Sequence, residues 1–265
     1  MLTQTEKANS FVALHERAGA FVIPNPWDVG SARVLAGLGF EALATTSGGF
    51  AQTLGRADGM VTLEEKLSHV RQLVGAVDLP LSVDLENGFA HRPEGVAANI
   101  LKVADAGAVG ASIEDHTRDP SNPIYEFDLA VERIHAAVEA AGSLSFPFTL
   151  TARSENFLWG RHDLDDTIRR LQAFEAAGAD VLYAPRLTTL DEVAAVAGAL
   201  SKPVNVLGPF VKGATVAQLA DAGARRISVG GVLNRAAVSG MIRAAEEMLR
   251  EGTFTWTNDL ATLTF

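Results

Sequence analysis

One short pattern occurs four times in the chain: an alanine-rich helical segment ends at a glycine and runs directly into a short apolar strand. The copies are AGLGFEALATT around Gly39, ADAGAVGASIE around Gly107, EAAGADVLYAP around Gly178 and ADAGARRISVG around Gly223. Glycine suits the position just after a helix because it adopts positive φ at little cost. The strands that follow lack strict polar alternation, which indicates strands buried on both faces.

Four further apolar strands are predicted between these copies. They are AFVIPN near Val22, LSVDLE near Val83, FTLTAR near Leu150 and PVNVLG near Val204. Helical patterns at 63–74, 129–141, 165–177 and 190–200 separate most of the strands. Strands that alternate with helices through right-handed crossovers form a parallel sheet.

Eight such units in 265 residues predict an α/β chain that forms one domain, residues 1–265, folded as a (β/α)8 TIM barrel. An open doubly wound sheet is the alternative. That fold is favoured by a Gly-x-Gly-x-x-Gly after the first strand, and the segment PNPWDVGSA does not contain one.

The charge balance excludes several classes of partner. The chain has 22 basic and 32 acidic residues, a net charge of −10, and no cysteine. Nucleic acids and anionic membrane surfaces attract basic patches, so neither is an expected partner. The absence of cysteine removes disulfides, thiolate metal sites and a cysteine nucleophile. No apolar run reaches a membrane span, and the N-terminal segment is read as an amphipathic helix rather than a signal peptide, so we expect a cytoplasmic protein.

Acidic residues gather where neighbouring strands end. Asp84 and Glu86 follow the strand near Val83, Glu114 ends the next strand, and Asp58 can approach from the preceding loop. In a barrel the carboxyl ends of the strands meet at one face, where active sites lie. Singly, such residues often cap helices. As a set of oxygen ligands without cysteine or a histidine pair, they predict a site for Mg²⁺ or Mn²⁺.

The order of these residues resembles the phosphoenolpyruvate mutase/isocitrate lyase superfamily. The series that carries the resemblance is Ser47-Gly48-Gly49, Asp58, Asp84-x-Glu86, Glu114-Asp115 and Thr151-Ala152-Arg153. The ending AGARRISVGGVLNRAAVSGMIRAAEEML is similar to the last strand and helix of that family. The resemblance implies a barrel whose C-terminal helix is exchanged between subunits, within a homodimer or homotetramer.

The resemblance also implies roles for individual residues. Asp84 would bind Mg²⁺ directly, while the waters of the ion would be held by Asp58, Glu86 and Glu114. The backbone N–H groups of residues 47–49 (Ser47, Gly48 and Gly49) would bind the carboxylate of a small 2-oxo acid. The remaining residues predicted to bind substrate are Trp27, Asp58, Asn205 and Arg153.

Arg153 would face the group that is cleaved or transferred. Its planar guanidinium matches a carboxylate or a phosphonate. A structural ion pair between Arg153 and Glu155 is the alternative, and helix packing is the alternative for Trp27.

Departures from the family narrow the chemistry. Isocitrate-type lyases of the family carry a cysteine in the loop after the fourth strand, and mutases carry a lysine and an asparagine there. Here that loop reads HTRDPSNPIYEFD and offers only Arg118 and Asn122. Glu86 is one methylene longer than the aspartate usual in the family. The sixth strand ends in Tyr183-Ala184-Pro185, where mutases have a histidine and lyases often a glutamate.

These observations favour a Mg²⁺-dependent lyase or decarboxylase that cleaves a C–C bond of a 2-oxo acid or hydroxy diacid through a metal-stabilised enolate. Arg153 is the predicted catalytic residue, and Tyr183, His116 and Glu114 are the candidate acids or bases. Cleavage of a P–C bond, as in phosphonomutases and phosphonopyruvate hydrolases, is the first alternative.

Two other classes stay open. One is a barrel that binds a 2-oxo acid without turnover. The other is a Schiff-base aldolase, for which Lys202 and Lys212 near the seventh strand are the nearest lysines.

Overall fold

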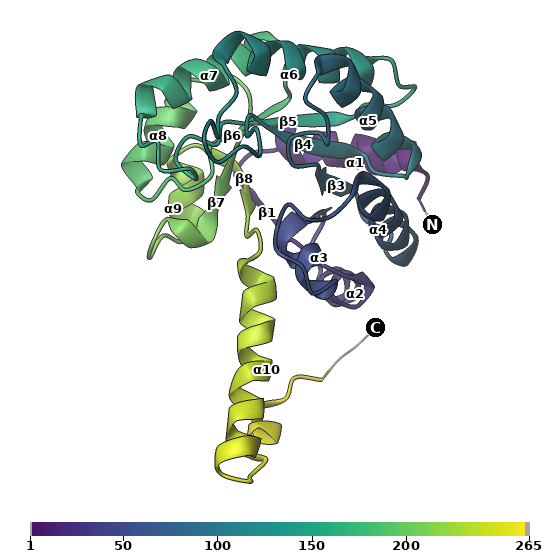
Figure 1. Ribbon diagram of the computed structural model, residues 1–265, viewed down its shortest axis with the longest axis vertical. Helices are drawn as coiled ribbons and strands as arrows, with labels where there is room; N and C mark the ends of the chain where they lie inside the picture. The colour runs from purple at the N-terminus through teal and green to yellow at the C-terminus, as the bar shows by residue number, and fades with distance from the viewer. Residues whose placement is uncertain (1, 263–265) are drawn as a thin grey trace.

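Eight parallel strands form a nearly closed barrel surrounded by helices in the computed structural model, which describes residues 2–262 (Figure 1). The strands are β1 Phe21–Ile23, β2 Leu43–Ala44, β3 Leu81–Asp84, β4 Gly110–Glu114, β5 Thr149–Arg153, β6 Val181–Tyr183, β7 Val204–Leu207 and β8 Ala224–Ser228. Their hydrogen-bonded order is β1-β8-β7-β6-β5-β4-β3-β2. The predicted (β/α)8 barrel is therefore confirmed.

The two ends of this order, β1 and β2, meet at a seam. The Ala44 backbone N–H donates to the Pro24 carbonyl oxygen at 3.1 Å. The Asn25 side chain adds a second link, because its Nδ2 donates to the Thr45 carbonyl oxygen at 3.1 Å. These contacts bring the short strand β2 beside β1 and complete the barrel.

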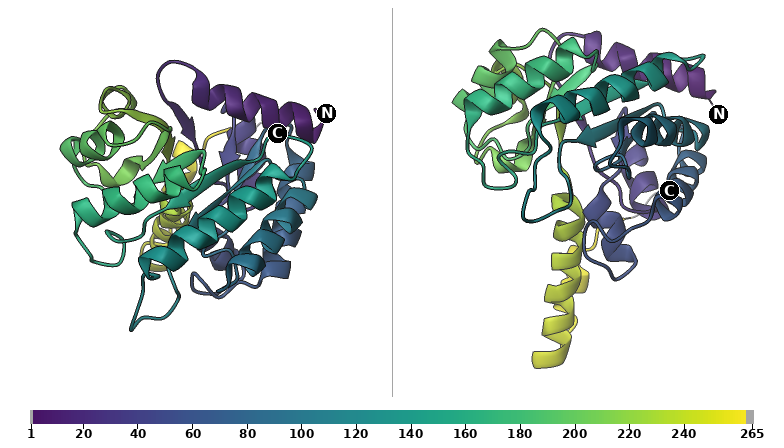
Figure 2. Two further views of the ribbon diagram at one scale, coloured as in Figure 1. Left: turned by 90° about the horizontal axis from the view of Figure 1, so that it is seen from above. Right: turned by 45° about the horizontal axis from the view of Figure 1, so that its top comes forward.

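Most of the helices connect successive strands and cover the outside of the barrel, whereas the first precedes β1 and the last follows β8 (Figure 2). They are α1 Gln4–Glu16, α2 Val29–Gly37, α3 Ser47–Thr53, α4 Leu63–Ala76, α5 Pro93–Asp105, α6 Phe127–Gly142, α7 Leu164–Ala176, α8 Leu190–Gly198, α9 Val216–Asp221 and α10 Val232–Arg250, with 3-10 turns η1 Gly208–Phe210 and η2 Thr255–Asp259. The four helices predicted from periodicity are α4, α6, α7 and α8, and their observed ends lie within two residues of the predicted ones.

Local sequence fixes where the helices begin and end. Thr62 and Glu65 form a capping box at the start of α4, and Thr189 and Glu192 form one at α8. Such reciprocal bonds satisfy backbone N–H groups that the first helical turn leaves unpaired. The four glycines of the repeated pattern all have positive φ, between 91° and 103°, as the sequence predicts for residues that follow a helix.

Helix α1 covers the N-terminal end of the barrel. Phe11 of α1 is fully buried, and its ring lies edge-on to Phe21 of β1 with the ring centroids 6.5 Å apart. The main hydrophobic core lies elsewhere, between the outer faces of the strands and the surrounding helices. With its N-terminal end covered in this way, the barrel is accessible from the opposite, carboxyl end of its strands.

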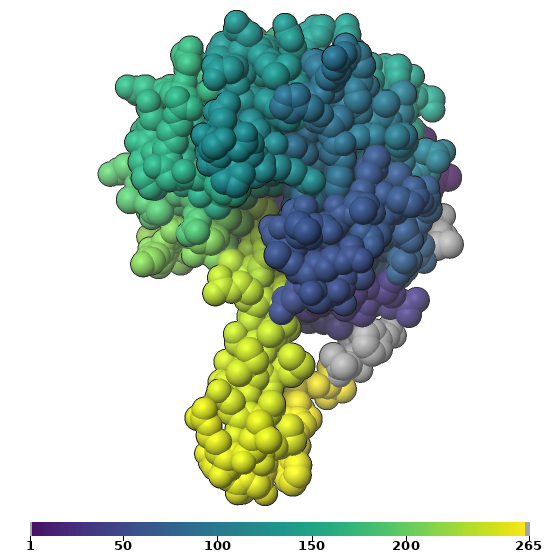
Figure 3. Space-filling model, viewed as in Figure 1, coloured from purple at the N-terminus to yellow at the C-terminus, as the bar shows by residue number. Residues whose placement is uncertain are grey.

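Helix α10 extends away from the barrel (Figures 1 and 3). Asn234 is the one buried residue along its length, whereas Met241, Ile242 and Leu249 are exposed. The chain then turns back, and Glu247 accepts hydrogen bonds from Thr253 and Thr255. No helix within residues 2–262 has the length and apolar character needed to cross a bilayer.

Candidate active site

A cavity of about 260 Å³ opens at the carboxyl ends of the strands. The sequence-predicted residues that line it are Ser47, Gly48, Asp58, Asp84, Arg153, Tyr183 and Asn205. These residues come from β3, β5, β6 and β7 and from the segment after β2, so parallel strand ends bring together positions up to 158 residues apart in the chain.

Arg153 is surrounded by carboxylates. Its guanidinium lies 2.9 Å from Asp84 Oδ1, 3.2 Å from Glu114 Oε2 and 2.9 Å from Glu155 Oε1. The ion pair with Glu155, which the sequence left open as the alternative to a role in binding substrate, is therefore present. Glu155 was not among the predicted site residues. Burial, acting against the attraction of Arg153, raises the pKa of Glu155 to about 8, because one arginine cannot fully compensate three buried acids.

Asp84 and Asp58 differ in their electrostatic environment. Burial acts to raise the pKa of Asp84, but the positive charges of Arg153 and Lys66 outweigh it and hold this pKa below its ordinary value. Burial and the neighbouring charge of Asp84 raise the pKa of Asp58. Two acids that repel each other in this way favour a cation between them.

The donor set matches a hard cation that keeps most of its water. Within residues 2–262 no three acidic or histidine side chains are close enough to bind one ion together. Asp84, with Asp58 on the same cavity, offers carboxylate oxygens, and Mg²⁺ in proteins is commonly held by one or two carboxylates and several waters. The residues thus fit direct binding by Asp84, with Asp58 and Glu114 toward the waters.

The segment Ser47-Gly48-Gly49 begins α3 beside the cavity. Ser47 N–H donates to Asp84 Oδ2 at 3.0 Å, and Gly49 N–H donates to the capping side chain of Thr46 at 3.3 Å. A Cβ atom at Gly48 would lie 3.1 Å from Asp58 Oδ2. Glycine at this position therefore lets the carboxylate of Asp58 approach the backbone closely.

Glu86 turns away from the cavity, although the sequence places it beside Asp84. It has a left-handed backbone, with φ 53°, and its carboxylate contacts Arg118 and lies 3.9 Å from Lys66 Nζ. Burial and the charge of Asp84 raise the pKa of Glu86 to about 7. Glu86 is thus better placed to hold Arg118 of the β4–α6 loop than to reach a metal ion.

Lys66 was not singled out by the sequence analysis. It is fully buried on α4, and its Nζ has no hydrogen-bond partner among the described residues. Nothing in the local sequence marks it, because a lysine at this point of an amphipathic helix is usually exposed. Its burial follows from the packing of α4 against β3.

Of three other predicted residues, only Tyr183 lines the cavity. Tyr183 lines it 5.1 Å (ring centroid) from the Arg153 guanidinium, and burial raises the pKa of Tyr183 to about 12. His116 lies outside the lining, stacked on Trp159 at 4.0 Å, with Nδ1 3.7 Å from Glu114 Oε1. Trp27 lines a separate depression with Phe50 on the outer surface.

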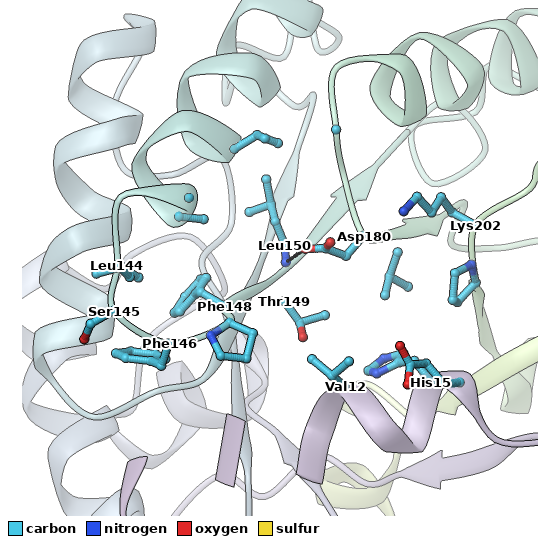
Figure 4. Close-up of a pocket in the computed structure, with 18 residues that line it drawn as sticks. Val12, His15, Leu144, Ser145, Phe146, Phe148, Thr149, Leu150, Asp180 and Lys202 are labelled. Atoms are coloured by element: carbon cyan, nitrogen blue, oxygen red, sulfur yellow. Dashed lines mark hydrogen bonds between the residues drawn. The ribbon is translucent and has the colours of Figure 1, made fainter. Parts of the chain in front are cut away.

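A larger cavity of about 590 Å³ lies near the N-terminal ends of β5 and β6 (Figure 4). It is lined by the apolar side chains of Phe146 and Phe148 and by His15, Asp180 and Lys202. Asp180 and Lys202 are exposed. The strand-end carboxylates do not line this cavity, so the smaller cavity is the candidate active site.

Comparison with known proteins agrees with this fold and site. Residues 11–249 match the family model of phosphoenolpyruvate phosphomutase, so the chain belongs to this family of enzymes. A solved structure from Burkholderia cenocepacia J2315, whose description leaves lyase and mutase open, is 55% identical, with a TM-score of 0.96 over 98% of this chain and 93% of that one.

Curated relatives include enzymes that cleave C–C bonds. The chain is 32% identical to 2-methylisocitrate lyase from Escherichia coli strain K12 over 63% of this chain and 57% of the relative. It is also 32% identical to oxaloacetate decarboxylase from Rhodopseudomonas palustris strain BisB18, over 68% of this chain and 63% of the relative.

Proposed function

We propose that the protein is a Mg²⁺-dependent lyase or decarboxylase that cleaves a C–C bond of a 2-oxo acid or hydroxy diacid. The observation that carries this proposal is the junction of Asp84, Arg153 and the Ser47 N–H group on one wall of the cavity. The lyase and the decarboxylase among the relatives support C–C cleavage over transfer of a phosphoryl group.

Asp84 would hold the ion, with Asp58 and Glu114 bonded to its waters. Bound Mg²⁺ would supply positive charge that stabilises the negative charge developing on the 2-oxo oxygen as the adjacent bond breaks. The N–H group of Gly48 would orient the substrate carboxylate, while that of Ser47 stays bonded to Asp84. The carboxylates of Asp84 and Glu114, which contact Arg153, would then also interact with the cation and its waters. Arg153 would therefore be able to turn toward the departing group.

Proton transfer would fall to Tyr183, Glu114 or His116. The pKa of about 12 keeps Tyr183 protonated, so its hydroxyl can donate a hydrogen bond or deliver a proton. Glu114, 3.2 Å from Arg153, and His116 beside it are the other candidates. In this proposal Tyr183 takes the role of acid that a loop cysteine fills in isocitrate-type lyases.

Pyruvate release with Mg²⁺ tests the proposal. Oxaloacetate, 2-methylisocitrate, other 2-substituted malates and phosphonopyruvate would be assayed in parallel, with EDTA and the Asp84→Asn variant as controls. Fast, EDTA-sensitive release from a C–C substrate is the expected result. Release from phosphonopyruvate alone would instead identify P–C chemistry. Binding of oxalate with no turnover of any compound would identify a barrel that binds a 2-oxo acid without reaction.

We further propose that α10 packs on the barrel of a second copy in a homodimer or homotetramer. The exposed Met241, Ile242 and Leu249 on a helix that contacts little of its own barrel support this. Light scattering at micromolar concentration should give at least twice the monomer mass of 28.0 kDa. Ile242→Glu should lower that mass, and a monomeric wild-type chain would contradict the proposal.

A further inference from the structure

The cavity does not stop at the strand-end carboxylates but continues into the middle of the barrel. Its lining includes Ser82 of β3 and Ser112 of β4, each one inward-facing position below the rim residues Asp84 and Glu114. Small side chains at these positions leave room that bulky branched residues usually fill in a barrel. Across this space, on β8, the cavity is lined by Arg226.

Arg226 is held by neutral groups. Its Nε donates to Asn205 Oδ1 at 2.8 Å and its Nη2 to Thr151 Oγ1 at 2.9 Å, while Nη1 lies 3.5 Å from His15 Nε2. His15 adds no charge, because burial lowers the pKa of His15 to about 3. The nearby ionisable hydroxyl of Tyr183 is also neutral, with its pKa near 12.

No carboxylate of the described residues forms an ion pair with this guanidinium, although Arg226 is only 5% exposed. Burial lowers the pKa of Arg226 to about 10, which leaves the side chain charged at neutral pH. A buried cation without a counter-charge is costly to maintain. An anion that enters the cavity would supply the missing charge.

Three other arginines with little exposure have charged or more numerous acceptors. Arg170 pairs with Asp115 and Asp166, and Arg153 contacts three carboxylates. Arg133 donates to three backbone carbonyls, and it does not line the cavity. These three arginines thus have carboxylates or three backbone carbonyls as acceptors, whereas Arg226 donates to one amide oxygen and one hydroxyl and faces open space.

Asn205 fixes the direction in which Arg226 points. Its Oδ1 accepts from Arg226 Nε and its Nδ2 donates to Ser228 Oγ at 3.0 Å. The amide is therefore oriented by two bonds and holds the guanidinium toward the barrel interior. Asn205, predicted from the sequence to touch substrate, acts in this arrangement as a positioning residue.

We propose that Arg226 binds the distal carboxylate of the substrate, so that the substrate is a diacid whose second carboxylate enters the middle of the barrel. This inference rests on the proposed function, which places the 2-oxo acid end at Asp84. Arg226 lies two residues before Ser228 at the rim, about 6.6 Å along the strand. A five-carbon 2-oxo diacid is long enough to extend this depth below the rim, and two-carbon oxalate is not.

Isothermal titration with Mg²⁺ and a matched pair of ligands tests the proposal. 2-Oxoglutarate and 2-oxovalerate have the same carbon chain, and only the former carries a distal carboxylate. The wild-type protein should bind 2-oxoglutarate at least about tenfold more tightly, as expected for a charge-assisted hydrogen-bonded pair. Arg226→Gln should abolish this preference while changing oxalate affinity less than about twofold. Arg225→Gln, on the outward face of the same strand, should retain it.

Two outcomes would overturn the proposal while leaving the proposed function intact. Equal wild-type affinity for the two oxo acids would show that no cation binds the distal carboxylate, and this comparison needs no variant. Retention of the preference in Arg226→Gln would assign the anchor to another residue. If Arg226→Gln fails to fold, the comparison of the two oxo acids in the wild-type protein still tests the proposal. Failure of the wild-type protein to bind oxalate with Mg²⁺ would instead refute the proposed function, and the anchor with it.

Discussion

Substitution of Lys66 by methionine is expected to destabilise the protein because it leaves Glu86 without its buried partner. Lys66 Nζ lies 3.9 Å from Glu86 Oε1, and both side chains are almost completely buried. At an effective dielectric constant of about 20, two unit charges at this distance attract by about 4 kcal/mol. Methionine fills nearly the same volume, so the effect of the substitution is chiefly electrostatic.

The net loss should be smaller than the attraction, because the buried ammonium of Lys66 is also costly and because Arg118 still contacts Glu86. We expect Lys66→Met to lower the free energy of unfolding by about 3 kcal/mol at pH 8, near the lower limit for removing one member of a buried pair. In the Glu86→Gln background the same substitution should cost less than about 1 kcal/mol. The difference between backgrounds, about 2 kcal/mol, is the coupling of the pair.

Urea unfolding in EDTA measures these values, with Lys102→Met as the control. Lys102 lies exposed on α5, and its substitution should change stability by less than about 0.5 kcal/mol. The cost of Lys66→Met should also shrink at pH 5.5, where Glu86, with its pKa near 7, is protonated. Equal losses in the two backgrounds, within about 0.5 kcal/mol, would refute the electrostatic account of this pair.

Three further predictions concern the site itself. Asp84→Asn should abolish Mg²⁺-dependent turnover and Mg²⁺ binding by titration calorimetry while leaving the circular dichroism spectrum unchanged; full activity would contradict the assignment of the metal ligand. In metal-free protein the melting temperature should fall as the pH rises from 5 to 8. The pKa of Glu155 is raised in the folded state to about 8, so the native protein holds a proton that the unfolded chain loses above its ordinary value near 4.5. The stability from this group is present at low pH and is lost as the pH rises through 8, by at most about 1.4 kcal/mol per pH unit. If the melting temperature of Glu155→Gln depends on pH as strongly as that of the wild-type protein, Glu155 is not the origin of the effect. Gly48→Ala should lower kcat/KM about tenfold, because its Cβ would lie 3.1 Å from Asp58 Oδ2 and displace that carboxylate. Gly75→Ala, with nothing within 4 Å of the added carbon, should have wild-type kinetics, and equal effects of the two substitutions would exclude the steric explanation.

The architecture could be predicted because each unit of the chain carries its own local signals. In each copy of the repeated pattern a glycine with positive φ follows the helix, and an apolar strand follows the glycine. These signals are local, so neighbouring residues are sufficient to interpret them. The strand ends then identify Asp84, Arg153 and Tyr183 as neighbours, because all parallel strands of a barrel point their carboxyl ends to one face.

The parts of the site that sequence did not reveal depend on three-dimensional packing. Arg226 stands between Arg225 and Ile227, and strand alternation shows that one of the two arginines faces inward but not which one. The orientation of Glu86 depends on its left-handed backbone, which residues other than glycine adopt only where the surrounding structure requires it. For Trp27 the sequence was misleading. This residue follows a strand end and was predicted to bind substrate, but it lies in a separate depression.

The seam between β1 and β2 has a consequence for how the barrel moves. One backbone hydrogen bond and the Asn25 side chain join these strands, whereas the other neighbouring strands are paired in a parallel ladder. Asn25 Oδ1 also accepts from the N–H groups of Val229 and Gly230 after β8. A single amide side chain therefore ties three strand ends together. Local opening should begin here, with the Ala44 amide exchanging its hydrogen faster than amides of the β4–β5 ladder. Because the segment that starts at Ser47 follows β2 directly, we expect such local opening to widen the site at this seam.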